Sequence, residues 1–265
     1  MIPQIVAATL ALLGAHPASL PAAGRSPPVY GPGEQLTYSI RYLGVEAGTA
    51  LITVGESAEQ GHAIWPIVAL ANSGPMLPFF PVHDKFVTYL NPASSLGESQ
   101  VLYADENHKR REQRFVLDRT ANAALVTRQK PGEPAVHDRI PIAPLTQDLT
   151  AATFQLRNSV FAVGQVLTIP VFTGMKSFSL QATVLSRQNM RTVMGPKEVF
   201  KVRVRTGFSG KFQSNRDMFA YMTTDASHVL VRIEADFLLG TLVAELKEYK
   251  QGRVIARAAD APKKG

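Results

Sequence analysis

The sequence predicts a mainly β protein: one large curved antiparallel sheet, or a half-open barrel, with one amphipathic helix against its concave side. Apolar residues alternate with polar ones in many short windows, as in strands with one buried and one solvated face. Nineteen Gly and eighteen Pro are spread between these windows and supply turns. Only one segment has the helical period, and an open sheet of many strands twists and curls.

The clearest strand pair begins at Gly33. Apolar residues occupy every second position from Leu36 to Tyr42, and the alternation resumes from Ala50 after a reversal bracketed by Gly44 and Gly48. Shorter windows of the same kind follow along the chain. We expect strands at residues 63–71, 85–91, 98–103, 112–117, 123–128, 166–172, 177–186, 199–206, 211–222, 229–233 and 241–249.

A helix is predicted between the two series of strands, over residues 148–160. Apolar side chains recur there at helical spacing and form one stripe. Pro144 and Thr146 mark its start, and Gly164 ends the segment. The stripe consists of Leu149, Ala152, Thr153, Leu156 and Val160. One amphipathic helix among many strands covers or plugs one face of the sheet.

The chain divides into four parts. With 265 residues and 45% hydrophobic content, it is long enough for one large β-domain, which we assign to residues 33–250. Residues 1–24 are typical of a secretion signal, because an apolar run precedes small residues and Pro, although no Lys or Arg comes before the run. Residues 25–32 form a Pro-rich lead and residues 251–265 a disordered tail. The signal predicts the periplasm or cell envelope of a Gram-negative bacterium.

Composition excludes several classes of site. Without Cys, the chain has no disulfide framework, thiolate nucleophile or cysteine-ligated metal. The six His lack metal-binding spacing, and no phosphate-binding loop or nucleophile elbow is present, so we expect no cofactor, no metal and no catalytic residue. In strands, the neighbours His83 and Asp84 point to opposite faces, as do His137 and Asp138.

The net charge of +7 is dispersed, which suits an anionic membrane surface or simple solubility. Its densest part is the run from His108 to Arg111, which either contacts phosphates or forms a solvated hairpin. No aromatic residues interleave with these cations, so we expect no nucleic-acid partner.

Several short motifs follow one another in a fixed order: Gly33-Glu34-x-Leu36-x-Tyr38-x-Ile40, Gly44-x-x-x-Gly48, His83-Asp84-x-Phe86, Asp148-Leu149 leading to Leu156-Arg157, Gly195-Pro196, Thr224-Asp225, and the segment 240–249. In this order they resemble the bacterial family known as domain of unknown function 3108, over most of residues 33–250. The resemblance implies a mainly antiparallel β architecture and an exported or envelope-associated protein. It supplies no catalytic residues.

The run from Met76 to Val82 is apolar and carries two Pro, which rules out ordinary central-strand pairing. Such a loop either caps the open end of the sheet or lines the mouth of an apolar groove. For the second case we predict that the groove lies between the sheet and the helix. Its predicted ligand-binding residues are Met76, Leu77, Phe79, Phe80, Leu149, Ala152 and Leu156.

These observations favour a non-catalytic envelope binding or assembly protein that holds an apolar ligand, such as a lipid chain, or an envelope protein partner. Peripheral contact with a membrane is compatible with the same features. The alternative is a periplasmic enzyme whose dispersed His and carboxylate residues converge only in three dimensions.

Overall fold

The computed structural model describes residues 28–59, 62–74, 81–159, 161–206, 217–237 and 240–253. The predicted signal at 1–24, most of the tail, and four predicted ligand-binding residues lie outside these ranges; the four are Met76, Leu77, Phe79 and Phe80.

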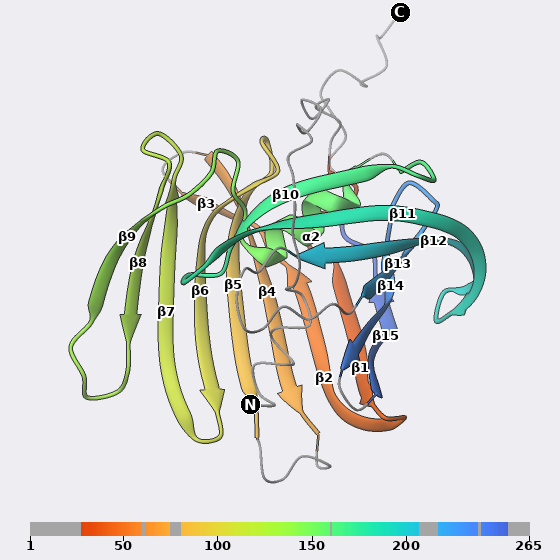
Figure 1. Ribbon diagram of the computed structural model, residues 1–265, viewed down its shortest axis with the longest axis horizontal. Helices are drawn as coiled ribbons and strands as arrows, with labels where there is room; N and C mark the ends of the chain where they lie inside the picture. Colours follow the sequence, from red (N-terminus) through yellow and green to blue (C-terminus); the bar gives the residue numbers. More distant parts are fainter. Residues whose placement is uncertain are drawn as a thin grey trace, which may run out of the picture.

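The chain forms two series of strands on either side of one helix (Figure 1). The first series is β1 (Gln35–Tyr42), β2 (Val45–Val54), β3 (Ser57–Glu59), β4 (His62–Ser73), β5 (His83–Asn91), β6 (Leu96–Glu106), β7 (Lys109–Asp118), β8 (Ala123–Gln129) and β9 (Val136–Pro141). After the helix α2 (Leu149–Arg157), the second series is β10 (Val166–Phe172), β11 (Ser177–Thr192), β12 (Gly195–Thr206), β13 (Met218–Thr223), β14 (Leu230–Phe237) and β15 (Gly240–Lys250).

Both series belong to one antiparallel sheet. Fourteen strands run in the order β10-β11-β12-β13-β14-β15-β1-β2-β4-β5-β6-β7-β8-β9, and β3 lies off this path and pairs with β4. The last strand therefore joins the first: Leu36 pairs with Tyr249, and Ile40 pairs with Ala244. In the described part of the chain the two ends of this order, β9 and β10, do not pair with each other.

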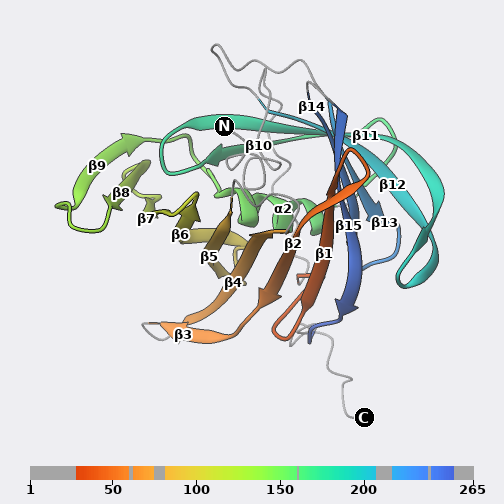
Figure 2. The same cartoon turned by 90° about the horizontal axis from the view of Figure 1, so that it is seen from below.

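The sheet rolls around the helix. In Figure 1 the second series crosses over the first, and Figure 2 shows α2 between the two, on the concave side. This arrangement confirms the predicted curved sheet with an internal helix.

The helix is buried on two sides. Ala151 and Phe154 pack with Trp65 and other residues of the first series, whereas Ala152 and Leu156 pack with the second series. The predicted single apolar stripe described only the second of these faces, because a helix inside a rolled sheet has no solvated side opposite its core side. The predicted boundaries also change: Asp148, rather than Pro144 or Thr146, precedes the first turn, and the helix ends at Arg157.

Where the structure describes them, the predicted strand windows fall on observed strands; residues 211–216 of the window 211–222 lie outside the described ranges. Three parts of the sheet were missed. The short strand β3 and the polar edge strand β9 were not predicted, and the β11–β12 hairpin extends to Thr192 and Gly195, beyond the predicted limits of 186 and 199. In this outer half of the hairpin, Arg187, Gln188 and Asn189 are all exposed, so no hydrophobic alternation marks the strand. The basic run from His108 to Arg111 forms the tip of the β6–β7 hairpin, with Asn107 and His108 at positive φ.

The described residues of the Pro-rich lead pack into the core. Tyr30 is 1% exposed, and its ring lies edge-on to Phe154 at 4.5 Å and to Trp65 at 6.0 Å between centroids. The Arg253 amide donates to the Pro32 carbonyl at 2.9 Å. A Cβ on Gly31 would lie 1.9 Å from the Arg253 carbonyl oxygen, so this close approach of two backbones requires Gly.

Candidate functional site

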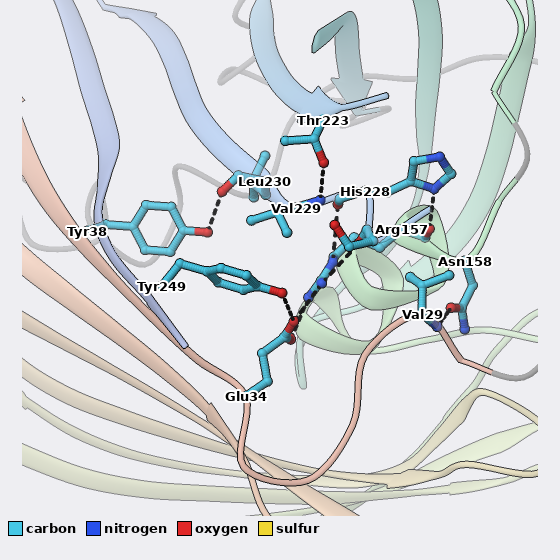
Figure 3. Close-up of polar contacts among 11 residues, drawn as sticks. Val29, Glu34, Tyr38, Arg157, Asn158, Thr223, His228, Val229, Leu230 and Tyr249 are labelled. Atoms are coloured by element: carbon cyan, nitrogen blue, oxygen red, sulfur yellow. Dashed lines mark hydrogen bonds and ion pairs between the residues drawn. The ribbon is translucent and has the colours of Figure 1, made fainter. Parts of the chain in front are cut away.

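A buried ion pair fixes the C-terminal end of α2. Nη1 of Arg157 lies 2.7 Å from Oε2 of Glu34, and Nη2 lies 2.8 Å from Oε1, so the guanidinium binds the carboxylate with both branches (Figure 3). The side chains of Arg157 and Glu34 are 2% and 1% exposed. Because two isolated charges at such depth would be strongly destabilising, this pair depends on its mutual contact and on further hydrogen bonds.

Those further hydrogen bonds are present. Arg157 donates to the carbonyls of His228 and Ser227, both at 3.2 Å, and the Tyr249 hydroxyl donates to Oε1 of Glu34 at 3.2 Å. Burial and the nearby Glu34 carboxylate raise the pKa of Tyr249 to about 12, so this hydroxyl keeps its proton. Burial alone disfavours the charged form of Arg157, but hydrogen bonding to Glu34 outweighs burial and the pKa of the guanidinium is raised.

Neighbouring groups tie the same helix end to three other segments. His228 Nδ1 lies 2.7 Å from the Arg157 carbonyl, and since a carbonyl only accepts, Nδ1 carries the proton. Asn158, the C-cap residue, accepts from the Val29 amide at 2.9 Å and donates to the Ser95 hydroxyl at 3.2 Å. The orphan groups at the end of the helix are therefore satisfied inside the protein.

Asp148 fixes the N-terminal end of α2. Its Oδ1 accepts from the amides of Thr150 and Ala151 at 2.9 and 3.0 Å, as an N-cap residue does. The same oxygen accepts from the side chains of Thr88 on β5, at 2.8 Å, and Gln100 on β6, at 2.9 Å. Oδ2 is buried and has no hydrogen-bond partner in the part of the chain that the structure describes, and burial raises the pKa of this carboxyl to about 6.

The sheet approaches this end of the helix at Gly97. A Cβ there would lie 2.5 Å from Oδ2 of Asp148 and 3.0 Å from the Cβ of Ala151. The Gly97 amide donates to the Gln147 side chain at 2.8 Å. The first-series side of the helix is therefore closely packed.

The second-series side leaves space. An apolar cavity of about 30 Å³ lies between α2 and strands β11 to β14. The helix contributes Ala152, Thr153 and Leu156 to its lining. The sheet contributes Leu180, Val204, Met218, Ala220, Met222, Leu230 and Ile233. In this state the cavity holds a small group at most.

The three predicted ligand-binding residues that the structure describes lie close together on one face of α2. Ala152 and Leu156 line the cavity, and Leu149 packs against the same cluster. Sequence reasoning missed the roles of Glu34, Asp148 and Arg157, although all three belong to the quoted motifs. Asp directly before an apolar helical segment is an N-cap signal that could have identified Asp148.

The histidines sit in varied surroundings. His83 is exposed and Asp84 buried, so these neighbours face opposite sides of β5 as predicted. His83 contacts Asn72, and His137 contacts Thr127. Within the described ranges, no three His, Asp or Glu side chains are grouped to hold a metal ion, and no helix has the length and hydropathy to cross a membrane.

Together these features define a class: a mainly β protein whose rolled antiparallel sheet encloses one helix, held at both ends by buried charged side chains. The chain belongs to the family of proteins of unknown function DUF3108, whose sequence profile matches residues 37–247. This confirms the family suggested by the motifs. Among curated proteins, none matches the chain.

Several solved structures are similar to this chain at low sequence identity. A β-barrel-like protein of the domain of unknown function DUF1849 from Brucella abortus has a TM-score of 0.58 at 11% identity, and the match covers 82% of this chain and 97% of that one. A candidate lipoprotein from Parabacteroides distasonis reaches a TM-score of 0.34 at 12% identity, with 84% and 98% covered. A candidate exported protein with a YmcC-like fold from Bacteroides fragilis reaches 0.32 at 8%, with 84% and 97% covered. Only the first has a TM-score high enough to indicate a shared fold, and at 11% identity the likeness concerns the fold alone.

Proposed function

We propose that the protein is a non-catalytic binding protein of the cell envelope that accommodates a hydrocarbon chain between α2 and strands β11 to β14. The observation that carries the proposal is the apolar cavity under α2. Among the described residues that line it, only Thr153 adds a hydroxyl to an otherwise apolar surface. Such a lining suits burial of an alkyl chain, which the hydrophobic effect drives without directional contacts.

A chain larger than 30 Å³ requires the cavity to widen. The sheet side of the cavity can rearrange to widen it, because Met218 and Met222 are unbranched and their thioethers adapt to irregular spaces. The helix itself stays in place, since Asp148 and Arg157 hold its two ends. Rotation of the two methionines, rather than departure of α2, is the opening that we infer.

Filling the cavity tests this site. Ala152→Val adds carbon from the helix and Ala220→Val adds it from the sheet, whereas Ala162→Val makes the same change at an exposed position. We expect the wild type and Ala162→Val to bind a fluorescent long-chain fatty acid, and each filling variant to bind it at least tenfold more weakly. Absence of binding by the wild type, or equal binding by all four proteins, would contradict the proposal.

The predicted loop residues Met76, Leu77, Phe79 and Phe80 are proposed to form the mouth of this site. Replacing Phe79 and Phe80 with Ser removes apolar surface there, so capture of the same fatty acid should weaken while thermal stability stays close to that of the wild type. A joint loss of folding would instead indicate that the loop caps the core.

The envelope location rests on the apolar N-terminal run and on the family resemblance. Fractionation of the native host, with detection of the chain in periplasmic and membrane fractions, tests it. Recovery in the cytoplasm would contradict it.

A further inference from the structure

A second feature lies on the convex face of the sheet, away from α2. A groove of about 410 Å³ crosses strands β5, β6, β7 and β8 near the β6–β7 hairpin. Lys85, one of its lining residues, is three positions from Thr88 in β5, and the Thr88 hydroxyl reaches Asp148 on the concave side. Because strand side chains alternate between faces, Lys85 points to the convex side.

The groove carries net positive charge. Three cationic side chains and two acidic ones face it, which leaves one positive charge. The cations are Lys85, Arg110 and Lys130, and the acids are Asp105 and Glu112. Lys130 also pairs with Glu133 at 3.1 Å. Arg111 also borders the groove, but its side chain points to the other face of β7 and binds Glu106 with both Nη groups.

Two of the cations retain donors for a ligand. Among the described residues, Arg110 contacts Asp105 through Nε alone, at 2.9 Å, so this ion pair orients the guanidinium while both of its Nη groups stay available. Lys85 Nζ lies 5.9 Å from the centre of the Tyr103 ring, and Tyr103 is 43% exposed. In register, Lys85 pairs with Tyr103 and Asp105 pairs with Arg110. Lys85 and Arg110 therefore lie on the two strands that neighbour Tyr103, whose exposed hydroxyl is a further hydrogen-bond donor for a ligand.

Apolar side chains lie farther along the same face, beyond the pair Arg114 and Thr127. Val116 and Leu125 are paired across β7 and β8, and they are 44% and 41% exposed. Glu112, a groove residue, lies four positions before Val116 in β7, so both point to the convex side. Cationic side chains beside exposed apolar ones fit the boundary between lipid headgroups and acyl chains.

We propose that this groove binds the phosphate of an anionic lipid headgroup, and that Lys85 and Arg110 contact the phosphate on the membrane surface. Val116 and Leu125 then face the lipid beside the headgroup. This site is separate from the cavity under α2, and either one can be wrong without the other.

Vesicle sedimentation with the full chain tests the proposal. One set of vesicles is pure phosphatidylcholine, and the other is an equal mixture of phosphatidylcholine and phosphatidylglycerol. Lys85→Gln with Arg110→Gln removes two charges from the groove, and Arg191→Gln with Lys197→Gln removes two from the distant β11–β12 hairpin. Unchanged thermal unfolding confirms that each protein is folded.

We expect the wild type to bind only the mixed vesicles. The groove variant should bind them roughly thirtyfold more weakly, about fivefold for each cation near the surface, whereas the hairpin variant should stay within about twofold of the wild type because its charges are screened. Lys85→Arg, which keeps the charge, should retain binding.

Three results would overturn the assignment. The first is no binding of the wild type to mixed vesicles. The second is an equal loss in both double variants, which would assign binding to net charge alone. The third is calorimetric binding of inorganic phosphate that the groove variant loses while vesicles stay unbound, which would make the ligand a soluble phosphate compound.

Discussion

Removing Arg157 is the sharpest perturbation of this fold. Arg157→Met keeps most of the side-chain volume but leaves Glu34, which is 1% exposed, as a buried carboxylate without its counter-ion. Breaking a buried pair in this way costs about 3 to 5 kcal/mol of unfolding free energy. The carbonyls of Ser227 and His228 also lose their donor, so the upper half of this range is expected. Since domains are stable by only about 5 to 15 kcal/mol, the loss is a large fraction of the total.

A double variant separates the charge from the packing. Glu34→Gln combined with Arg157→Met removes both charges, and the Tyr249 hydroxyl can still donate to the new amide. We expect the double variant to recover about 2 kcal/mol relative to the sum of the two single variants. Arg114→Met is the matched control, because its ion pair with Glu112 is long, at 3.9 Å, and exposed. Its loss should stay below about 1 kcal/mol.

Urea unfolding measures these differences with two probes. The chain has one Trp, the buried Trp65, whose fluorescence reports the first series, and far-ultraviolet circular dichroism reports the whole sheet. Coincident transitions justify a two-state analysis. The reasoning is refuted if Arg157→Met costs no more than Arg114→Met, or if the double variant shows no coupling.

Three further predictions concern the helix and its N-terminal end. Burial raises the pKa of Asp148 from 3.8 to about 6, so the folded state binds this proton more tightly than the unfolded state, and the unfolding free energy falls by about 3 kcal/mol as pH rises through that interval. Asp148→Asn keeps an accepting oxygen but cannot titrate, so the unfolding free energy measured in urea should fall less between pH 3.8 and 6 than it does in the wild type. The contribution of Asp84, whose pKa is also raised to about 6, should remain. An unchanged dependence of the unfolding free energy on pH would contradict the assignment. Gly97→Ala should lower the free energy of unfolding by about 1 to 3 kcal/mol, because its Cβ would meet Asp148 at 2.5 Å, and an unchanged melting temperature would show that the sheet and helix separate easily. Phe154→Ala should cost about 3 to 5 kcal/mol in the same assay, since the ring is fully buried against Tyr30, and a cost below 1 kcal/mol would show that the helix is loosely held.

Much of the sheet was predictable because a strand with one buried face shows alternating apolar and polar residues in the sequence. The apolar side chains at every second position, Leu36, Tyr38 and Ile40, are all buried. Where both faces are solvated, as from Arg187 to Asn189, the sequence shows no such alternation, and the strand forms through backbone pairing with β12 alone. The edge strand β9 escaped prediction for the same reason.

The candidate site was predictable only in part. Helical spacing alone placed Leu149, Ala152 and Leu156 on one face, because the distances within a helix follow from its geometry. Glu34 and Arg157 are 123 positions apart, and no spacing rule relates two charges that meet only after the sheet has rolled. Ala151 and Phe154 were missed because an amphipathic pattern assumes a solvated face, which this helix lacks.

The two sides of α2 differ in how closely they pack against the sheet, and this difference decides on which side a hydrocarbon chain would fit. On the first-series side, rigid aromatic rings of Tyr30, Trp65 and Phe154 interlock, and Gly97 brings the backbone against the helix. Because these groups are closely packed, moving the helix away from the first series would break many of their contacts. On the second-series side, small Ala and adaptable Met side chains leave the cavity of about 30 Å³. Apolar packing alone does not fix the rotation of a helix between two such walls, because it is non-directional. The hydrogen bonds of Asp148 and Arg157 are directional, so they hold the rigid face toward the first series and keep the adaptable face toward the cavity.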